Sequence, residues 1–259
     1  MRVGTETLYR QSLANMQRNQ ADAARAQNQL SSGVRVQRAG DDPTAFAAAQ
    51  RLDSRLSEID GQARSSERAM QRLSLAEVAI DDAANAVGRI RELMLRAGSP
   101  TLSPTDRQAI EVEVRQRLDE VYSISNRQDG DGNSLFAGHA PGAAYVRAAD
   151  GSVSYAGDDG QRLVSIAQDQ TVADGDAGPR VFGAAGDDVF TRIEAALAAL
   201  AEPDNALRSE AIGESLRSLD ETLKGFDIGR ARIGSRLSAI DNAAATREAE
   251  VLQLKTTLG

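Results

Sequence analysis

The C-terminal stretch of this chain reads IGSRLSAIDNAAATREAEVLQLKTTL (residues 233–258). Its seam residues follow one another at alternating steps of four and three, and they are Ile233, Leu237, Ile240, Ala244, Arg247, Val251, Leu254 and Leu258. On an α-helix this spacing places the side chains on one narrow stripe, which is typical of a helix that packs along its length against another helix. The stretch therefore predicts a long helix with a partner helix.

The first half of the chain contains a second segment with the same spacing. Its seam residues are Leu52, Leu56, Ile59, Ala63, Ser66, Met70, Leu73, Glu77, Ile80, Ala84 and Val87. The pattern continues over about five heptads, which favours a long helical pair over a compact bundle. We expect the two segments to pack against each other in antiparallel orientation. The predicted fold class is mainly α: an elongated antiparallel helical rod, similar to a coiled-coil bundle and built from both chain ends, with a small inserted β-rich tip domain.

Start and stop signals divide the first half of the chain into helices. Asp42 is a natural N-cap before Pro43, and the helix that follows is expected to end at Gly98-Ser99-Pro100. Ser103, with Asp106 three residues later, is a second start signal. We predict that this second helix ends near Gln128.

Three more helices are predicted in the second half. The first begins at Asp188 and runs to Ala201, and the next begins after Glu202-Pro203-Asp204 and ends near Lys224. We expect the glycines of Gly225-Phe226-Asp227-Ile228-Gly229 to interrupt the pattern, because glycine is unfavourable inside a helix. The final long helix would then begin at about residue 230.

Residues 130–186 differ in character, because they hold 11 of the 22 glycines. Runs rich in β-branched residues at 144–146, 152–155 and 163–166 predict short strands, and Asp150-Gly151 predicts a hairpin turn between the first two. These signals predict three domains: an N-terminal assembly helix and linker (1–40), a helical rod domain (41–130 plus 187–259) and a small β-rich tip domain (131–186).

Residues 5–32 predict a further helix, although a weak one. Its seam carries Leu13, Met16 and Leu30, with two glutamines at the seam positions between them. Such a helix buries little apolar area against the entropy of ordering it, so we expect it to be frayed in an isolated monomer. Gly33 is predicted at the C′ position, with a loop after it.

The composition argues against several classes of protein. Aromatic residues make up only 3% of the chain, tryptophan is absent, and the net charge of −8 is unsuited to nucleic acid. Without cysteine, the chain has no disulfide, thiolate metal site or cysteine nucleophile. The sequence has neither the run of about 18 apolar residues that a membrane span needs nor the apolar core of a secretory signal. We therefore expect neither nucleic acid nor a membrane as a partner.

Signatures of catalysis and ligand binding are scarce. His139 is the only histidine, and no Gly-x-Ser-x-Gly motif supplies a nucleophile for it. The run Asp129–Asn133 is similar to the opening of a calcium loop, but Ser134 and Ala140 stand where glycine and a bidentate glutamate are required. We expect a polar turn at this run and a surface position for His139. The prediction is no enzyme activity, no catalytic residue, no cofactor and no bound metal.

Several motifs resemble the bacterial flagellin family. Gln29–Val36, followed by Asp41-Asp42-Pro43, is similar to the N-terminal signature in which a Leu-Ser-Ser-Gly turn and a double aspartate join the terminal helix to the rod. Proline after the double aspartate, where flagellins usually have alanine, resembles the members that connect the hook to the filament. Three further stretches resemble the entry to the outer domain, a part of that domain and the returning helix, and they are Asn133–Gly138, Ser154–Arg162 and Ala231–Leu237.

The resemblance implies a structural protein of the bacterial flagellum that connects hook and filament by self-assembly. It implies an extracellular location, reached through the flagellar type III apparatus without a cleaved signal peptide. The implied partners are other copies of this chain in a ring, the other protein of the hook–filament junction, flagellin and a flagellar export chaperone. Family members normally continue for several heptads past the position of Gly259, so either this sequence is a shortened piece or this family member is itself shorter.

Two alternatives stay open at this point: a filament subunit of the flagellin type, and a hydrolase with its site in the β-rich tip. For the seams we hypothesise a division between assembly, carried by Leu13, Met16 and Leu30, and monomer stability. The stability positions are Leu56, Ile59, Leu237 and Ile240. The complete set of predicted assembly and packing residues is Leu13, Met16, Leu30, Leu52, Leu56, Ile59, Ile233, Leu237, Ile240 and Leu254.

Overall fold

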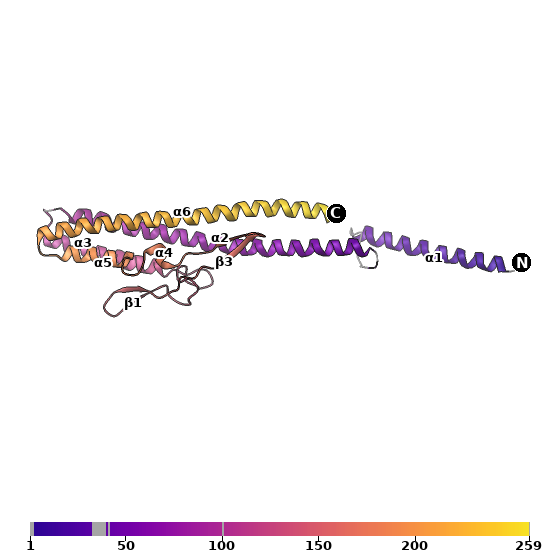
Figure 1. Cartoon of the computed structure of the whole chain (residues 1–259), viewed down its shortest axis with the longest axis horizontal. Coiled ribbons are helices and arrows are strands. Elements are labelled where there is room, and N and C mark those ends of the chain that lie inside the picture. The colour runs from indigo at the N-terminus through magenta and orange to yellow at the C-terminus, as the bar shows by residue number, and fades with distance from the viewer. Residues whose placement is uncertain (1–2, 33–39, 41, 100, 259) are drawn as a thin grey trace. The chain divides into compact units, whose positions relative to one another are not determined.

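The computed structural model describes residues 3–32, 40, 42–99 and 101–258 of the chain. Long helices dominate it, and two small antiparallel sheets lie between them, which confirms the predicted mainly α fold class (Figure 1). The elements are α1 (Val3–Ser32), α2 (Pro43–Ala97), α3 (Pro104–Ser125), β1 (Tyr145–Arg147), β2 (Val153–Tyr155), β3 (Leu163–Ala167), β4 (Gln170–Ala173), α4 (Gly178–Phe182), α5 (Val189–Ala201) and α6 (Asn205–Leu258).

The chain divides into two compact units, one of residues 1–60 with 248–259 and one of residues 61–247. The division into an assembly helix, a rod and a tip domain stays a prediction. The expected C′ residue Gly33 and most of the loop after it lie outside the described residues. In the part of the chain that is described, no helix combines the length and the apolar character needed to cross a membrane.

The predicted helix starts are confirmed by their capping bonds. Asp42 Oδ1 accepts from the backbone N–H groups of Thr44 and Ala45 at 3.1 and 2.9 Å. Ser103 Oγ accepts from the N–H of Asp106 at 3.1 Å and donates to its carboxylate at 2.7 Å, so the cap is reciprocal. These bonds satisfy N–H groups that have no partner within the helix.

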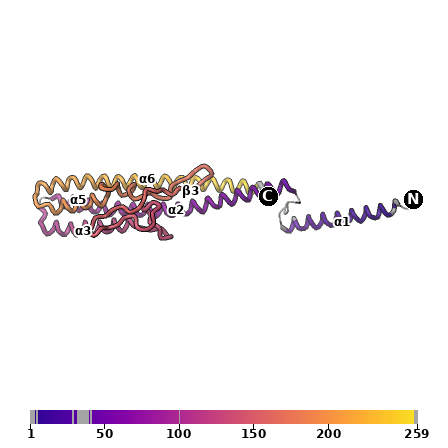
Figure 2. The backbone as a smooth tube through the Cα atoms, turned by 60° about the horizontal axis from the view of Figure 1, so that its bottom comes forward, coloured from indigo at the N-terminus to yellow at the C-terminus, as the bar shows by residue number. Residues whose placement is uncertain are grey.

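Within the second unit, α6 lies alongside α2 in antiparallel orientation (Figures 1 and 2). Three side-chain pairs establish the direction, because residues that come later in α2 pair with residues that come earlier in α6. The pairs are Ser66–Arg247 at 3.1 Å, Asp81–Arg230 at 2.9 Å and Arg91–Asp220. The expected antiparallel pairing is therefore observed in this unit.

The core of the second unit forms where α3 and α5 pack together and cover the long helices. Side chains from four helices are almost completely excluded from solvent there, and they include Leu73, Ile80, Ile90, Val114, Val121, Ile193, Leu219 and Phe226. Burial of this apolar surface is the main favourable contribution to folding.

The predicted break at Gly225–Gly229 is wrong, because α6 runs without interruption over 54 residues. Tertiary packing explains the difference. The Phe226 ring is fully buried and meets the Phe182 ring edge-on at 5.8 Å. A Cβ at Gly229 would lie 3.6 Å from Ile80 Cδ1, so α2 passes close to α6 at this point. These contacts outweigh the cost of about 1 kcal/mol that each glycine imposes on a helix.

The β region of the second unit consists of two hairpins. Strands β1 and β2 pair with Tyr145 opposite Tyr155, and Gly151 in the connecting turn has a φ of 93°, as the hairpin prediction requires. Strands β3 and β4 pair with an irregularity between Ser165 and Ala167. Neither β4 nor the short helix α4 was expected from the sequence, and α3 ends at Ser125, a little before the predicted end at Gln128.

In the first unit, the start of α2 and the end of α6 are joined by an ion pair. Arg55 Nε lies 2.8 Å from Glu250 Oε1, and its Nη1 lies 2.9 Å from Glu58 Oε2. Helix α1 belongs to the same unit and begins and ends close to the predicted bounds.

Candidate assembly surface

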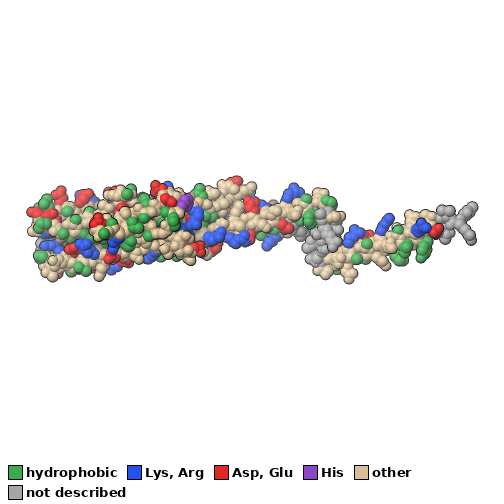
Figure 3. Space-filling view, turned by 90° about the horizontal axis from the view of Figure 1, so that it is seen from below, with side chains coloured by type: hydrophobic (Ala, Val, Ile, Leu, Met, Phe, Trp, Pro, Cys, Tyr) green, Lys and Arg blue, Asp and Glu red, His purple; other side chains and the backbone are tan. Residues whose placement is uncertain are grey.

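Helix α1 presents its apolar side chains to solvent. Leu13 is 48% exposed, Met16 is 61% exposed and Leu30 is 87% exposed. Two local ion pairs, Glu6–Arg10 at 2.9 Å and Asp22–Arg25 at 3.2 Å, stabilise the helix surface only weakly. Figure 3 shows hydrophobic side chains, in green, at the surface of this helix. An exposed apolar stripe of this length is typical of a surface that another helix covers.

Two further exposed apolar residues of α1 were not predicted from the sequence. Tyr9 is 72% exposed and Leu8 is 70% exposed. Tyr9 stands four residues before Leu13, so the four-three spacing extends one step further toward the N-terminus. The spacing alone was therefore sufficient to identify Tyr9, whereas Leu8 lies beside the stripe and has no such signal.

The other predicted seam residues are more deeply buried. Leu52, Leu56 and Leu254 are half-buried, and Ile59 is 3% exposed in the first unit. In the second unit, Ile233 and Ile240 are buried and Leu237 is half-buried against the core. The structure thus separates the exposed set on α1 from the buried set on α2 and α6, while the roles assigned to both sets stay predictions.

A buried arginine attaches the segment between α3 and β1 to α2. The Nη2 of Arg72 donates to the carbonyl oxygens of Ser134 at 2.7 Å and Leu135 at 3.3 Å, and its Nη1 pairs with Asp129. Burial by itself would raise the pKa of the Asp129 carboxyl. Hydrogen bonds from the backbone N–H groups of Asn133 and Asp131, together with the charge of Arg72, outweigh this effect, so the pKa is lowered. The Asp129 carboxylate therefore serves to bind Arg72.

A second attachment joins the β region to α6. Asp176 is 6% exposed and receives two bonds from Arg236, at 2.9 and 3.2 Å, and one from Gln161 at 2.8 Å. Its neighbour Asp174 pairs with Arg162 at 2.8 Å. Buried carboxylates require such partners, because an unpaired charge in a protein interior is strongly unfavourable.

The motifs around His139 and Asp158 form a tight turn structure. Asp158 Oδ1 accepts from the backbone N–H groups of His139 at 2.8 Å and Gly160 at 2.7 Å. These bonds lower the pKa of the Asp158 carboxyl. A Cβ at Gly138, whose φ is 71°, would collide with Asp158. These contacts explain why glycine and aspartate occupy these positions of the turn. The His139 side chain is exposed at the surface.

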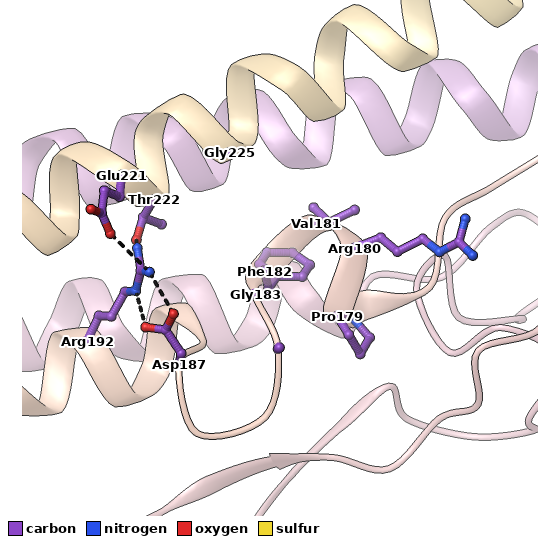
Figure 4. Close-up of a pocket in the computed structure, with 11 residues that line it drawn as sticks. Pro179, Arg180, Val181, Phe182, Gly183, Asp187, Arg192, Glu221, Thr222 and Gly225 are labelled. Atoms are coloured by element: carbon purple, nitrogen blue, oxygen red, sulfur yellow. Dashed lines mark hydrogen bonds and ion pairs between the residues drawn. The ribbon is translucent and has the colours of Figure 1, made fainter.

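A pocket of 220 Å³ lies between α4, the segment that follows it and α6 (Figure 4). Arg192 lies at one end of the pocket, bonded to Asp187 at 2.9 and 3.0 Å and to Thr222 Oγ1 at 3.1 Å, with Glu221 at 3.3 Å. Its charge is neutralised within the pocket, and Arg180 points away from this group in Figure 4. Within the described residues, no three histidines or carboxylates converge as metal ligands would.

Comparison with known proteins identifies the family. Residues 3–140 match the model of the bacterial flagellin N-terminal helical region. This match covers more than half of the chain, which therefore belongs to the flagellin family. The matched region contains α1, α2 and α3, and thus the exposed stripe of α1 and the seam of α2.

Three similar proteins narrow the comparison. Flagellar hook-associated protein 3 of Salmonella typhimurium is 27% identical over 259 residues, which cover 93% of this chain and 81% of that protein. The crystal structure of Xanthomonas campestris FlgL has a TM-score of 0.72 at 23% identity, covering 80% of this chain and 99% of that one. The flagellar junction protein FlgL from Legionella pneumophila has a TM-score of 0.69 at 16% identity, covering 83% and 100%. The two structures show that the fold is shared.

Proposed function

We propose that this protein is a structural component of the bacterial flagellum that joins the hook to the filament. The observation that supports this role most directly is the likeness to Salmonella hook-associated protein 3, which extends over 93% of the chain. The solved Legionella relative is described as a flagellar junction protein. We infer a structural role and no catalytic activity.

The exposed stripe on α1 supports a role in assembly. Tyr9, Leu13, Met16 and Leu30 lie on a helix whose described side chains are almost all exposed, so the monomer gains little stability from them. Covering them with another helix would remove apolar surface from water at about 25 cal/mol per Å². In this proposal α1 is ordered fully when the protein assembles, and a weakly held helix is also easily unfolded for export.

The proposed partners follow from the same role. They are further copies of this chain in a ring, the other hook–filament junction protein, flagellin and an export chaperone that covers the exposed helix before assembly. The proposed location is the extracellular flagellum, with export through the flagellar type III apparatus and no cleaved signal peptide. The proposed domain roles are assembly for residues 1–40, a rod for 41–130 with 187–259, and an outward tip for 131–186.

Genetic complementation tests the proposal. A bacterium that lacks its own hook–filament junction protein is expected to release flagellin into the medium, and expression of this chain should restore attached filaments. The measurement is the ratio of flagellin in sheared filaments to flagellin in the culture supernatant. An unchanged ratio, with the chain present outside the cell, would contradict the junction role.

The second candidate function is that of a filament subunit, which the match to the flagellin N-terminal region favours. Expression in a strain that lacks flagellin separates the two roles. A filament subunit would form long filaments in this strain, whereas a junction protein would stay confined to the hook end. Immunogold labelling of isolated hooks distinguishes these outcomes.

A further inference from the structure

Arg247 is a buried arginine that has no acidic partner in the described part of the chain. It is 7% exposed and stands at a seam position of α6. Its Nη1 donates to Ser66 Oγ of α2 at 3.1 Å and to the carbonyl oxygen of Ile166 in β3. Burial lowers the pKa of its guanidinium, and no neighbouring carboxylate counters the effect. Arg247 therefore carries a buried positive charge that the described residues leave uncompensated.

Two other arginines are buried among the described residues, and both are better satisfied. Arg72 is also 7% exposed, but it pairs with the carboxylate of Asp129. Arg208 is 9% exposed, and both of its terminal nitrogens are bonded, to the carbonyls of Glu202 and Pro203 and to Asn205. In Arg247 only one of the two terminal nitrogens has an acceptor among the described residues.

Two nitrogens of the Arg247 guanidinium have no acceptor among the described residues. Nε and Nη2 make no hydrogen bond to any described residue, and neither is among the fully enclosed polar atoms without a partner. The edge that these two nitrogens form is therefore not completely enclosed, although the side chain as a whole is buried. Two adjacent N–H donors on one edge of a guanidinium match the two oxygens of a carboxylate, which they bind with two parallel hydrogen bonds.

We propose that this edge of Arg247 binds an aspartate or glutamate side chain of a second copy of this chain during assembly. The proposal rests on the self-assembly in the proposed function. Charge complementarity favours a second copy, because the chain carries 38 acidic residues against 30 lysines and arginines and thus offers many carboxylates. A desolvated guanidinium also binds a carboxylate more strongly than a fully hydrated one does.

The alternative is a purely structural role, in which Arg247 serves to fix β3 on the two long helices. The two roles predict different effects of a substitution on the stability of the monomer. If Arg247 fixes β3 on the helices, it stabilises the folded monomer. If its charge is compensated only by a partner, it contributes little to the stability of the monomer. Loss of one member of a buried ion pair is strongly destabilising because it leaves the other charge unpaired, whereas removal of a buried charge without an ionic partner leaves no opposite charge behind.

The experiment compares the full-length variants Arg247→Gln and Arg247→Lys with Arg236→Gln. Arg236 is the matched control, because it lies on the same helix and pairs with the buried Asp176. The melting temperature of each purified chain is measured together with its amount in sheared flagella. Arg236→Gln should lower the melting temperature by about 10 °C, because it leaves Asp176 buried without its cation. Arg247→Gln should stay within about 3 °C of the unsubstituted chain.

Assembly provides the second measurement. Arg247→Gln should reduce the amount of chain in sheared flagella at least about tenfold, and Arg247→Lys, which keeps the charge, should reduce it less. A fall in melting temperature as large as that of Arg236→Gln would overturn the proposal, and so would normal incorporation of Arg247→Gln. If the unsubstituted chain itself fails to restore attached filaments, the proposed junction role is contradicted. If the unsubstituted chain and Arg247→Gln are both incorporated normally, only the carboxylate site is rejected.

Discussion

Helix α1 and the long helices of the second unit carry the same four-three spacing, but their seam side chains have opposite surroundings. Leu13 on α1 is 48% exposed, whereas Ile240 on α6 is completely buried. In the second unit, α2 and α6 pack with α3 and α5 and are also attached to the β region by Arg72 and Arg236. Within the described residues, α1 has no element packed over its stripe of apolar side chains.

This difference shows that four-three spacing predicts a partner helix but does not indicate whether that helix belongs to the same chain or to another one. In the second unit the partner helix is part of the same chain, so burial of the seam stabilises the monomer. For α1 the exposed stripe is available to another chain. A substitution in the first seam should therefore act on assembly, and a substitution in the second should act on folding.

The largest effect on stability is expected at the centre of the buried seam. Ile240→Ala should lower the free energy of unfolding by about 2–5 kcal/mol, because it removes buried methyl groups and leaves a cavity. Leu252→Ala is the control, since Leu252 lies on the same helix and is 67% exposed. It should change stability by less than about 0.5 kcal/mol. Urea denaturation measures both, and equal effects would remove the distinction between buried and exposed positions of α6.

A smaller effect is expected in the turn structure of the β region. Gly138→Ala combines a positive φ with a collision against Asp158, whereas Gly142→Ala has a positive φ of 95° and open space around the new Cβ. The control should cost about 1 kcal/mol for the backbone conformation alone. Gly138→Ala should cost about 1–3 kcal/mol more, because the neighbouring backbone must shift. Equal losses in thermal unfolding would show that the two turns are not packed as described.

The N-cap of α2 is expected to contribute about 1 kcal/mol. Asp42→Ala removes the acceptor of the Thr44 and Ala45 N–H groups, so hydrogen exchange of these amides should accelerate. Asp53→Ala, at an exposed position within the same helix, is the control and should leave those amides unchanged. Accelerated exchange in both variants would mean that the cap is not what holds the helix start.

The Asp158 turn should make stability depend on pH in the acidic range. Hydrogen bonds from the N–H groups of His139 and then Gly160 lower the pKa of Asp158 in the folded protein. Its contribution is therefore fully present above the unfolded value of about 4 and is lost as the pH falls through the lower folded value. The stability difference between the unsubstituted chain and Asp158→Asn should narrow between neutral pH and about pH 2.5. A difference that is constant over this range would contradict the assigned bonds.

Local signals explain which parts of the fold were predictable from the sequence. The caps at Asp42 and Ser103 and the hairpin turn at Gly151 depend on residues close in sequence, and all three are found. The continuity of α6 through Gly225 and Gly229 was not predictable, because it depends on Phe226 meeting Phe182 and on the approach of Ile80.

The candidate surface was predictable to a similar extent. The exposed positions Leu13, Met16 and Leu30 follow from the spacing of a helix that has weak seam residues. The attachments made by Arg72 and Arg236 were not predictable, because their partners lie 57 and 60 residues away in sequence. The seam position of Arg247 follows from the spacing, but its contacts with Ser66 and Ile166 were recognised only in the structure.

The most direct test of the two-seam account is the incorporation of a Leu13→Ala, Leu30→Ala double variant into flagella, measured by immunoblotting of sheared filaments. The account predicts that the melting temperature of the purified variant stays within about 3 °C of the unsubstituted chain. It also predicts that the variant is nearly absent from the sheared fraction and that flagellin appears in the medium. Normal incorporation, or a large drop in melting temperature, would contradict the account.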